Sequence, residues 1–328
     1  MTVPLGEFDL IARYFSRPSP RADVLLGVGD DAALLQPPPG QALVAATDTL
    51  VEGRHFLPGT PAQAIGHQAL AVNLSDLAAM GAEPAWALLS LSMPAVDEAW
   101  LEAFARGLHG LAQAHGVALV GGDTVAGPLV ITVEVLGFVP ATQALRRGGA
   151  RAGDALFVSG WPGEAAAGLD LLRHGRCGFD ADDRRVQRFL YAEPRLALGR
   201  ALRGLASAAM DVSDGLLGDL GKLVRASAVG ARIDLDRLPV APVLASHEPR
   251  ARCERYVLGG GDDYELLFTV PPGRIAELTA AAARAEVAVH YIGDIVVGEG
   301  VQCLRQGTPE AVEVSGFDHF ATKASGEP

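Results

Sequence analysis

The sequence predicts an α/β protein of two domains. Its 328 residues are more than one hydrophobic core usually organises. Short apolar segments typical of strands alternate with segments of helical spacing along the whole chain. Between them, residues 143–154 are rich in Arg and Gly and poor in apolar side chains, which is typical of a domain boundary. We therefore expect an N-terminal α/β domain over residues 1–142 and a C-terminal α/β domain over residues 143–328.

In the first domain, the apolar spacing predicts three helices and five strands. Pro61 suits the start of a helix, and Gly81 and Gly116 suit helix ends. The helices are expected over residues 8–15, 61–80 and 97–115, and the strands over residues 24–28, 42–47, 86–93, 117–120 and 129–139.

The second domain repeats the alternation of strands and helices. Strands are expected over residues 155–159, 208–212, 264–270 and 289–295, and helices over residues 164–174, 184–190, 195–205, 216–227 and 274–284. Each half carries a strand that runs into an Asp-Gly turn, but this likeness is too slight to indicate a duplication.

Composition narrows the class of protein. Hydrophobic residues make up 49% and charged residues 20%, which is typical of a globular chain, and the net charge of −12 argues against a nucleic-acid surface. Three scattered cysteines have no zinc spacing and indicate a reducing compartment. We see neither a signal peptide nor an apolar run long enough to span a membrane, so we expect a soluble, cytoplasmic protein.

Aspartates recur in six short clusters, several of them where a strand would give way to a loop. Carboxylates are costly to bring together unless a positive charge lies between them, and Mg²⁺ prefers a few carboxylates together with water and substrate phosphate. The chain is therefore interpreted as a Mg²⁺-dependent phosphate enzyme. The clusters are Gly29-Asp30-Asp31, Thr47-Asp48-Thr49, Asn73-Leu74-Ser75-Asp76, Gly121-Gly122-Asp123-Thr124, Asp211-Val212-Ser213-Asp214 and Gly261-Asp262-Asp263.

Each cluster also has a simpler interpretation. Asp-Gly turns are common in all proteins, and Ser213 is predicted to cap the helix that follows it, where Gly215 would favour an anion. Arg146 and Arg147 suit phosphate, but they would also suit a solvated linker, and His55 alone is more often structural. The sequence contains no P-loop, no protein-kinase motif set and no arrangement typical of a covalent nucleophile.

The strands predicted in the first domain are almost wholly apolar, so a sheet covered by its own helices on one face needs cover on the other. A second copy would supply that cover, and we expect a homodimer through this domain. Along strand 86–93 the outward face is expected to carry Leu89 and Leu91, or else Leu88 and Ser90.

Taken together, the motifs resemble one family, thiamine-monophosphate kinase, from about residue 7 to residue 320. The motifs that carry the resemblance are Gly27-Val-Gly-Asp-Asp-Ala-Ala33, Thr47-Asp-Thr-Leu-Val-Glu-Gly-Arg-His-Phe56, Ala71-Val-Asn-Leu-Ser-Asp-Leu-Ala-Ala-Met-Gly-Ala82, Val120-Gly-Gly-Asp-Thr124, Asp211-Val-Ser-Asp-Gly-Leu216, Gly260-Gly-Asp-Asp-Tyr-Glu-Leu266 and Gly316-Phe-Asp-His-Phe320.

The resemblance implies the aminoimidazole-ribonucleotide-synthetase-like fold, in which the N-terminal sheet forms a barrel with that of its dimer mate. It also implies ATP-dependent phosphorylation of thiamine monophosphate to thiamine diphosphate, by direct in-line transfer with several Mg²⁺ ions.

Residue by residue, the resemblance implies three groups of contacts. Metal contacts fall on Asp31, Thr47, Asp48, Asp76, Asp123, Asp211 and Asp214; ATP contacts fall on Gly122, Asp123, Arg147 and Ser213; substrate contacts fall on His55, Asp262 and Phe317. The sequence departs from the family pattern at Ala46, where relatives often carry Ser, and at Asp262, where relatives often carry Glu.

Two alternatives stay open at this point. One is another enzyme of the same superfamily, such as aminoimidazole-ribonucleotide synthetase or selenophosphate synthetase; the latter lacks support because no Cys and Lys pair lies near the N-terminus. The other is a non-catalytic protein that binds metal or nucleotide.

Overall fold

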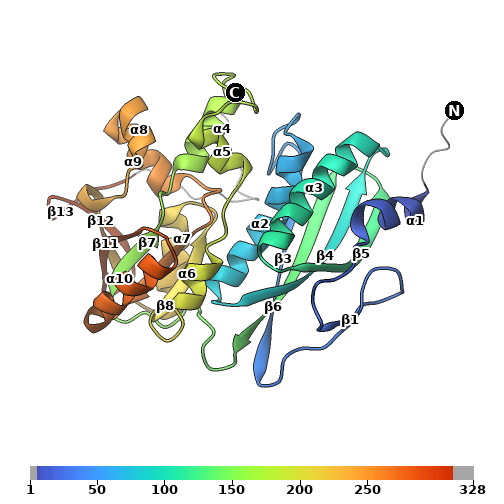
Figure 1. Ribbon diagram of the computed structural model, residues 1–328. Helices are drawn as coiled ribbons and strands as arrows, with labels where there is room; N and C mark the ends of the chain where they lie inside the picture. The colour runs from blue at the N-terminus through green and yellow to red at the C-terminus, as the bar shows by residue number, and fades with distance from the viewer. Residues whose placement is uncertain (1–5, 313–328) are drawn as a thin grey trace.

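The N-terminal half is a four-stranded sheet with helices on one face. The computed structural model describes residues 6–312. The strand order is β3 (Gln41–Val51), β6 (Val130–Pro140), β4 (Glu83–Met93) and β5 (Ala118–Ala126), with only the β4–β5 pair parallel. Helices α2 (Ala62–Ala79) and α3 (Glu98–Ala114) cover one face, as Figure 1 shows. Within the described residues this sheet is open, with β3 and β5 at its edges.

Side-chain alternation along β4 separates the two faces of this sheet. Leu89 and Leu91 are buried in the core beneath α2 and α3. Leu88 joins a separate cluster on the opposite face, where Ser90 is exposed. The first expectation for the outward face, Leu89 and Leu91, is therefore wrong, and its alternative, Leu88 and Ser90, is correct.

Helices α2 and α3 pack unusually close because each presents a glycine to the other. A Cβ at Gly66 would lie 2.0 Å from the Phe104 carbonyl oxygen, and one at Gly107 would lie 1.9 Å from that of Gln63. The backbones therefore touch where the helices cross, and any larger residue would force them apart.

The C-terminal half is a seven-stranded sheet. Its order is β13 (Thr308–Pro309), β12 (Gly300–Arg305), β9 (Gly230–Asp234), β11 (Val289–Val296), β7 (Ala155–Ser159), β10 (Glu265–Val270) and β8 (Ala208–Val212), and only β12–β9 is parallel. The helices are α4 (Glu164–Arg173), α5 (Arg184–Leu190), α6 (Leu196–Ala201), α7 (Leu216–Ser227), α8 (Pro242–His247), α9 (Arg250–Gly259) and α10 (Ile275–Arg284), with 3-10 turns η2 (Leu235–Arg237) and η3 (Pro272–Arg274).

One large hydrophobic cluster spans both halves. Strands β7, β8 and β10 are buried along their whole length. One face of this sheet, which carries Phe157 and Phe268, belongs to the same cluster as the residues of α2 and α6. The other face packs on α7 through Leu216 and Leu220. Helix α2 therefore lies between the two sheets (Figure 1), and the residues it carries can reach both domains.

A short N-terminal region completes the description. Helix α1 (Glu7–Leu10) continues into a π-helix, η1 (Ile11–Phe15), which packs against α3. Strands β1 (Val24–Leu26) and β2 (Leu34–Leu35) form a hairpin, and Val24 and Leu35 pack onto the outer face of the main sheet beside Trp86. No helix among residues 6–312 is long and apolar enough to cross a membrane.

Most predicted elements are confirmed, and those of the second half often to the residue: β7, α5, β8 and α7 have the expected bounds. Strand β4 begins three residues earlier than expected, and two other strands extend past an aspartate that was expected to follow them. Strand β3 continues through Asp48 to Val51, and β5 through Asp123 to Ala126. Both aspartates therefore lie within paired strands, and the prediction that they follow the strand ends is wrong. Each strand continues because its neighbour, β6 or β4, pairs with it over this length.

Candidate active site between the two domains

A pocket of about 1360 Å³ lies between the two domains. It takes residues from β3 and the turn after it, from α2, from the α4–α5 pair, and from the loops that follow β8 and α9. The polar residues that line it are Asp48, Thr49, Arg54, His55, Asp76, Arg147, Asp170, Arg173, His174, Asp211, Ser213, Asp214, Lys222, Tyr256, Asp262 and Tyr264. A smaller pocket of about 470 Å³, between η1 and α3, contains none of the predicted site residues.

Three carboxylates from different elements meet in this pocket. Asp48 lies on the helix-facing side of β3, Asp76 in the last turn of α2, and Asp211 in β8 of the other domain. A hydrogen bond joins the domains here, because the Ser75 hydroxyl donates to Asp211 Oδ2 over 2.9 Å. Asp76 lines the pocket, whereas Asn73, three residues earlier on the same helix, is buried and donates to the Ala69 carbonyl.

The electrostatics of the pocket favour added positive charge. Burial and then the charges of Asp211 and Asp48 raise the pKa of Asp76 to about 7, although Arg147 lowers it. Burial also raises the pKa of Asp211 to about 6; Ser75 lowers it, and Asp219 and Asp48 add to the rise. The protein alone therefore does not fully neutralise the negative charges of Asp76 and Asp211.

The turn after β8 is held by Asp219, a residue that the sequence did not single out. One oxygen of its buried carboxylate accepts the backbone N–H groups of Ser213 and Asp214, each at 3.0 Å. Lys222 Nζ donates to Asp219 Oδ1 at 2.8 Å and to Asp214 Oδ2 at 2.5 Å. The prediction that Ser213 is the N-cap is wrong: Gly215, with a φ of 103°, holds that position, two residues after Ser213.

The loop before β10 holds two residues other than glycine in left-handed conformation, Asp262 with φ 64° and Tyr264 with φ 51°. Their backbone N–H groups donate to the carbonyl oxygens of Ser213 (3.0 Å) and Val212 (2.9 Å). Burial raises the pKa of Asp262 to about 6. Left-handed backbone at such residues costs free energy and clusters at functional sites, so this loop is a strong candidate for ligand contact.

The turn after β3 supplies His55. Its Nδ1 accepts the backbone N–H of Val51 over 3.0 Å, so the proton of the neutral ring lies on Nε2. Helix α4 contributes Arg173 and Asp170 to the same pocket. Asp170 forms an ion pair with Arg252 at 2.7 Å and accepts a hydrogen bond from the Tyr256 hydroxyl at 3.0 Å.

The other predicted residues lie elsewhere. Thr47 and Asp123 lie on the outer face of the sheet, in strand positions alternate to those that face the helices. Asp31 is exposed in the connection between β1 and β2. At Gly122 a Cβ would lie 1.8 Å from the Leu89 carbonyl oxygen. The close approach of β4 is therefore a sufficient reason for glycine at this position. Phe317 lies outside the described residues.

The structure thus brings together Asp48, Asp76, Asp211, Asp214, Arg147, Ser213, His55 and Asp262 in one pocket. It adds Lys222, Asp219 and Arg173 to the candidates. Lys222 carried a signal in the sequence: it is one of only two lysines and lies one helical turn after Asp219, close behind the Asp211–Asp214 cluster.

The donor set suits a hard divalent cation, because the raised pKa values of Asp76 and Asp211 show that their negative charges are not fully compensated. Among residues 6–312, however, no group of three or more His, Cys, Asp or Glu side chains is arranged to hold an ion by itself. Mg²⁺ commonly takes one or two carboxylates and fills its remaining sites with water and substrate phosphate. The pocket therefore fits metal that arrives with a phosphate ligand, and the individual metal contacts stay predictions.

Comparison with known proteins places both halves in one family. The model for the N-terminal domain of AIR synthase related protein matches residues 29–139, and the model for its C-terminal domain matches residues 151–304. The two matches leave residues 140–150 between them.

The relatives and solved structures agree. Thiamine-monophosphate kinase of Escherichia coli K12 is 49% identical over 97% of this chain and 99% of its own length, and that of Haemophilus influenzae is 42% identical over 96% and 98%. The crystal structure of thiamine-monophosphate kinase from Stenotrophomonas maltophilia K279a, at 45% identity, has a TM-score of 0.84, and the match covers 89% of this chain and 93% of that one.

A further structure, AaThiL complexed with AMPPCP and TMP, is 32% identical, with a TM-score of 0.76 and coverage of 87% and 89%. The hydrogenase maturation protein HypE of E. coli, at 22% identity and a TM-score of 0.75, shares the fold. With this identity over nearly its whole length, the chain belongs to the thiamine-monophosphate kinase family of enzymes.

Proposed function

We propose that the protein transfers the γ-phosphoryl group of ATP to thiamine monophosphate and so forms thiamine diphosphate, with Mg²⁺ as the required metal. The observation that carries this proposal is the pocket itself, in which Asp48 and Asp76 of one domain face Asp211 and Asp214 of the other. Family membership supports it, and so does the related structure with an ATP analogue and TMP.

The residues of the pocket suit a reaction between two anions. Asp48, Asp76, Asp211 and Asp214 would hold Mg²⁺, which supplies charge neutralisation for the phosphates when it is bound. Arg147 and Lys222 line the same pocket and add positive charge, and the planar guanidinium of Arg147 matches phosphate oxygens.

Positioning is the main task in such a transfer, because the acceptor is an ionised phosphate oxygen that needs little help from a base. The pocket provides walls from both domains that can hold donor and acceptor in line. Asp262 and His55 are proposed contacts of the thiamine moiety, and Arg147, Ser213, Gly122 and Asp123 are proposed contacts of ATP. Direct transfer agrees with the absence of a nucleophile–base pair in the motifs of the chain.

The working unit is proposed to be a homodimer formed through the outer face of the N-terminal sheet. Large apolar side chains are exposed in this domain, on β3 and on the β1–β2 hairpin: Leu43 is 49% exposed, Leu25 62% and Leu34 57%. A second copy of the chain would cover them and extend the open sheet toward a barrel. Thr47 and Asp123 lie on this face, so their predicted roles depend on what the second copy brings to it.

A substrate panel tests the proposal. With ATP and Mg²⁺, the protein should convert thiamine monophosphate to thiamine diphosphate and leave free thiamine unphosphorylated. Equal or better turnover of free thiamine would refute it, as would ATP turnover only with aminoimidazole-ribonucleotide precursors or selenide.

A further inference from the structure

The segment from residue 262 to residue 265 faces two ways. Asp262 and Tyr264 line the interdomain pocket. The residues between and after them, Asp263 and Glu265, are 2% and 0% exposed and do not line it. Alternate side chains of this segment therefore join the pocket to a buried polar cluster behind it.

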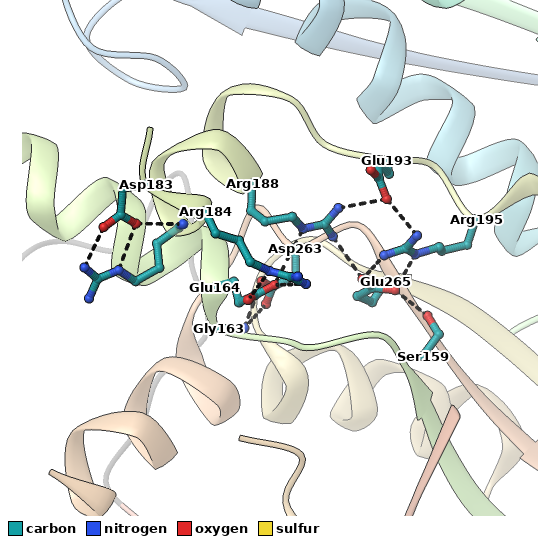
Figure 2. Close-up of polar contacts among 11 residues, drawn as sticks. Ser159, Gly163, Glu164, Asp183, Arg184, Arg188, Glu193, Arg195, Asp263 and Glu265 are labelled. Atoms are coloured by element: carbon teal, nitrogen blue, oxygen red, sulfur yellow. Dashed lines mark hydrogen bonds and ion pairs between the residues drawn. The ribbon is translucent and has the colours of Figure 1, made fainter. Parts of the chain in front are cut away.

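Glu265 is the centre of that cluster, which Figure 2 shows. Its carboxylate accepts from Arg195 Nε at 2.7 Å, from Arg188 Nη2 at 2.9 Å and from the Ser159 hydroxyl at 2.6 Å. Burial alone would raise the pKa of Glu265, but the hydrogen bonds from Arg195 and the charges of both arginines lower it below its ordinary value. Glu265 is therefore an ionised group that two arginines clamp from different elements.

The two arginines of the cluster lie on elements that form or support the walls of the pocket. Arg188 lies on α5 beside Phe189, which lines the pocket. Arg195 precedes α6, which packs on α2 so closely that a Cβ at Gly199 would lie 2.0 Å from the Ala78 carbonyl oxygen. Helix α2 in turn carries Asp76.

Asp263 connects the same segment to helix α4. Both of its oxygens lie 2.8 Å from the backbone N–H of Gly163, at the start of α4 (Figure 2). Helix α4 contributes Asp170 and Arg173 to the pocket. The buried pair Asp263 and Glu265 therefore ties the loop with Asp262 to the α4–α5 wall opposite it.

We propose that Glu265 is a positioning residue for the phosphate acceptor: through Arg188 and Arg195 it fixes the loop of Asp262 and Tyr264 relative to the α4–α5 wall. This inference rests on the proposed function, in which that loop contacts thiamine monophosphate. Without the Glu265 charge, Arg188 keeps the buried Glu164 at 4.0 Å and the exposed Glu193. Arg195 keeps Glu193, whose side chain is 67% exposed and holds it only weakly. The loop of Asp262 and Tyr264 then keeps its backbone hydrogen bonds to Ser213 and Val212. It is no longer tied through Glu265 to Arg188 and Arg195.

Calorimetric titration of Glu265→Gln with thiamine monophosphate and, separately, with Mg²⁺ and AMPPCP tests the proposal. Glutamine keeps the shape and removes the charge. We expect the Kd for thiamine monophosphate to rise about tenfold, which corresponds to the loss of roughly one hydrogen bond between the loop and the acceptor. The Kd for the nucleotide should stay within about twofold, because its proposed contacts lie on other elements.

Asp183→Asn is the matched control. It breaks another arginine–carboxylate pair of α5, Arg185 with Asp183 at 2.7 Å, but neither residue lines the pocket. Thermal unfolding should show destabilisation in both variants, and only Glu265→Gln should change the Kd for thiamine monophosphate. If Glu265→Gln does not fold, Arg195→Lys, which keeps the charge but loses the two-pronged contact, should raise that Kd about threefold.

An unchanged Kd for thiamine monophosphate in a folded Glu265→Gln or Arg195→Lys, or an equal change in Asp183→Asn, would overturn the proposal. Turnover of the wild type is measured separately. A wild type that binds thiamine monophosphate without phosphorylating it would refute the proposed function, whereas the ratio of the Kd values would still decide the role of Glu265.

Discussion

Asp48 is the carboxylate of the pocket that β3 contributes, and its charge raises the pKa of both Asp76 and Asp211. We predict that Asp48→Asn lowers kcat/KM with thiamine monophosphate by about 10²-fold or more, because it removes charge from the position where the phosphates must meet. The apo protein should be at least as stable as the wild type, since like charges then repel less.

A coupled assay for thiamine diphosphate, together with thermal unfolding without Mg²⁺, measures both effects. Asp182→Asn, at an exposed position outside the pocket, is the control and should leave both unchanged. Near wild-type turnover of Asp48→Asn at saturating Mg²⁺ would mean that Asp48 is only a strand residue.

His67 is predicted to make stability depend on pH. Its Nε2 is 2.8 Å from the Ala192 carbonyl oxygen of the other domain, and burial lowers its pKa although this hydrogen bond and Glu193 raise it in part. The unfolded state, with a pKa of about 6.5, therefore binds the proton more tightly than the folded state. The contribution of His67 to stability is complete above about pH 6.5 and is lost as the pH falls below that value.

Urea unfolding at about pH 7.5 and about pH 5.5 tests this for the wild type and for His67→Gln, which can donate the same hydrogen bond but does not titrate. The wild type should lose more free energy of unfolding between the two pH values than the variant loses. An equal loss would show that His67 does not carry the dependence.

At the scale of single residues, the sequence predicted the types of side chain better than their directions. Asp48 and Asp76 were expected in the site and line the pocket. Thr47, next to Asp48, was expected there too, but strand alternation turns it to the opposite face. The role of Asp219 depends on two backbone N–H groups of a turn, and no motif reveals such a contact before the fold is known.

At the scale of elements, the crossing of α2 and α3 is predicted to tolerate no side chain at its centre. Gly107→Ala would place a Cβ 1.9 Å from the Gln63 carbonyl oxygen, so we expect a loss of about 3 kcal/mol as the helices separate. Gly110→Ala lies one turn further along the same helix with nothing within 4 Å, and alanine should stabilise the protein there by up to about 1 kcal/mol.

Urea unfolding of both variants decides the matter, because the two substitutions are chemically identical and differ only in their surroundings. Destabilisation of equal size in both would mean that helix propensity or the unfolded state, and not the crossing, governs Gly107.

The elements themselves were predictable where their pattern was strong. Helix α2 and strands β7 and β8 have long apolar runs with clear ends, and their bounds agree with the expectation within a residue or two. Strands β2, β9, β12 and β13 and helices α8 and α9 were missed. The strands are short, and the helices lie in polar, proline-containing segments such as 249–259 that have no clear period. Strands β3 and β5 were cut short at their aspartates, since their true ends depend on the pairing partner.

At the scale of the whole molecule, the site depends on how the halves meet. Asp76 and Asp211 are far apart in sequence and are joined through Ser75 across the domain boundary. Neither hydrophobic period nor turn chemistry encodes such a contact. The recurrence of aspartate clusters indicated a metal site, and the resemblance to a family assigned Asp76 and Asp211 to it. The pocket therefore exists only while the shared core around α2 holds the two sheets in place.

We predict a homodimer, and the two faces of the N-terminal sheet indicate which substitutions should disrupt it. In sedimentation velocity at micromolar concentration, the wild type should have twice the 34.1 kDa mass of the chain. Ser90→Arg and Leu43→Arg place charge on the exposed outer face and should yield folded monomers, since burying an unpaired charge in an interface is costly. Val297→Arg, at an 88% exposed position of the other domain, should remain a dimer.

Leu91→Asp separates assembly from folding. Leu91 is buried beneath the helices, so a charge there should unfold the N-terminal domain instead of releasing an intact monomer. A wild type that is monomeric and fully active would refute the dimer together with the barrel that the resemblance implies. If both Ser90→Arg and Leu43→Arg remain dimers, the interface must lie on another surface. Thr47 and Asp123 would then remain solvent-facing residues of an open sheet.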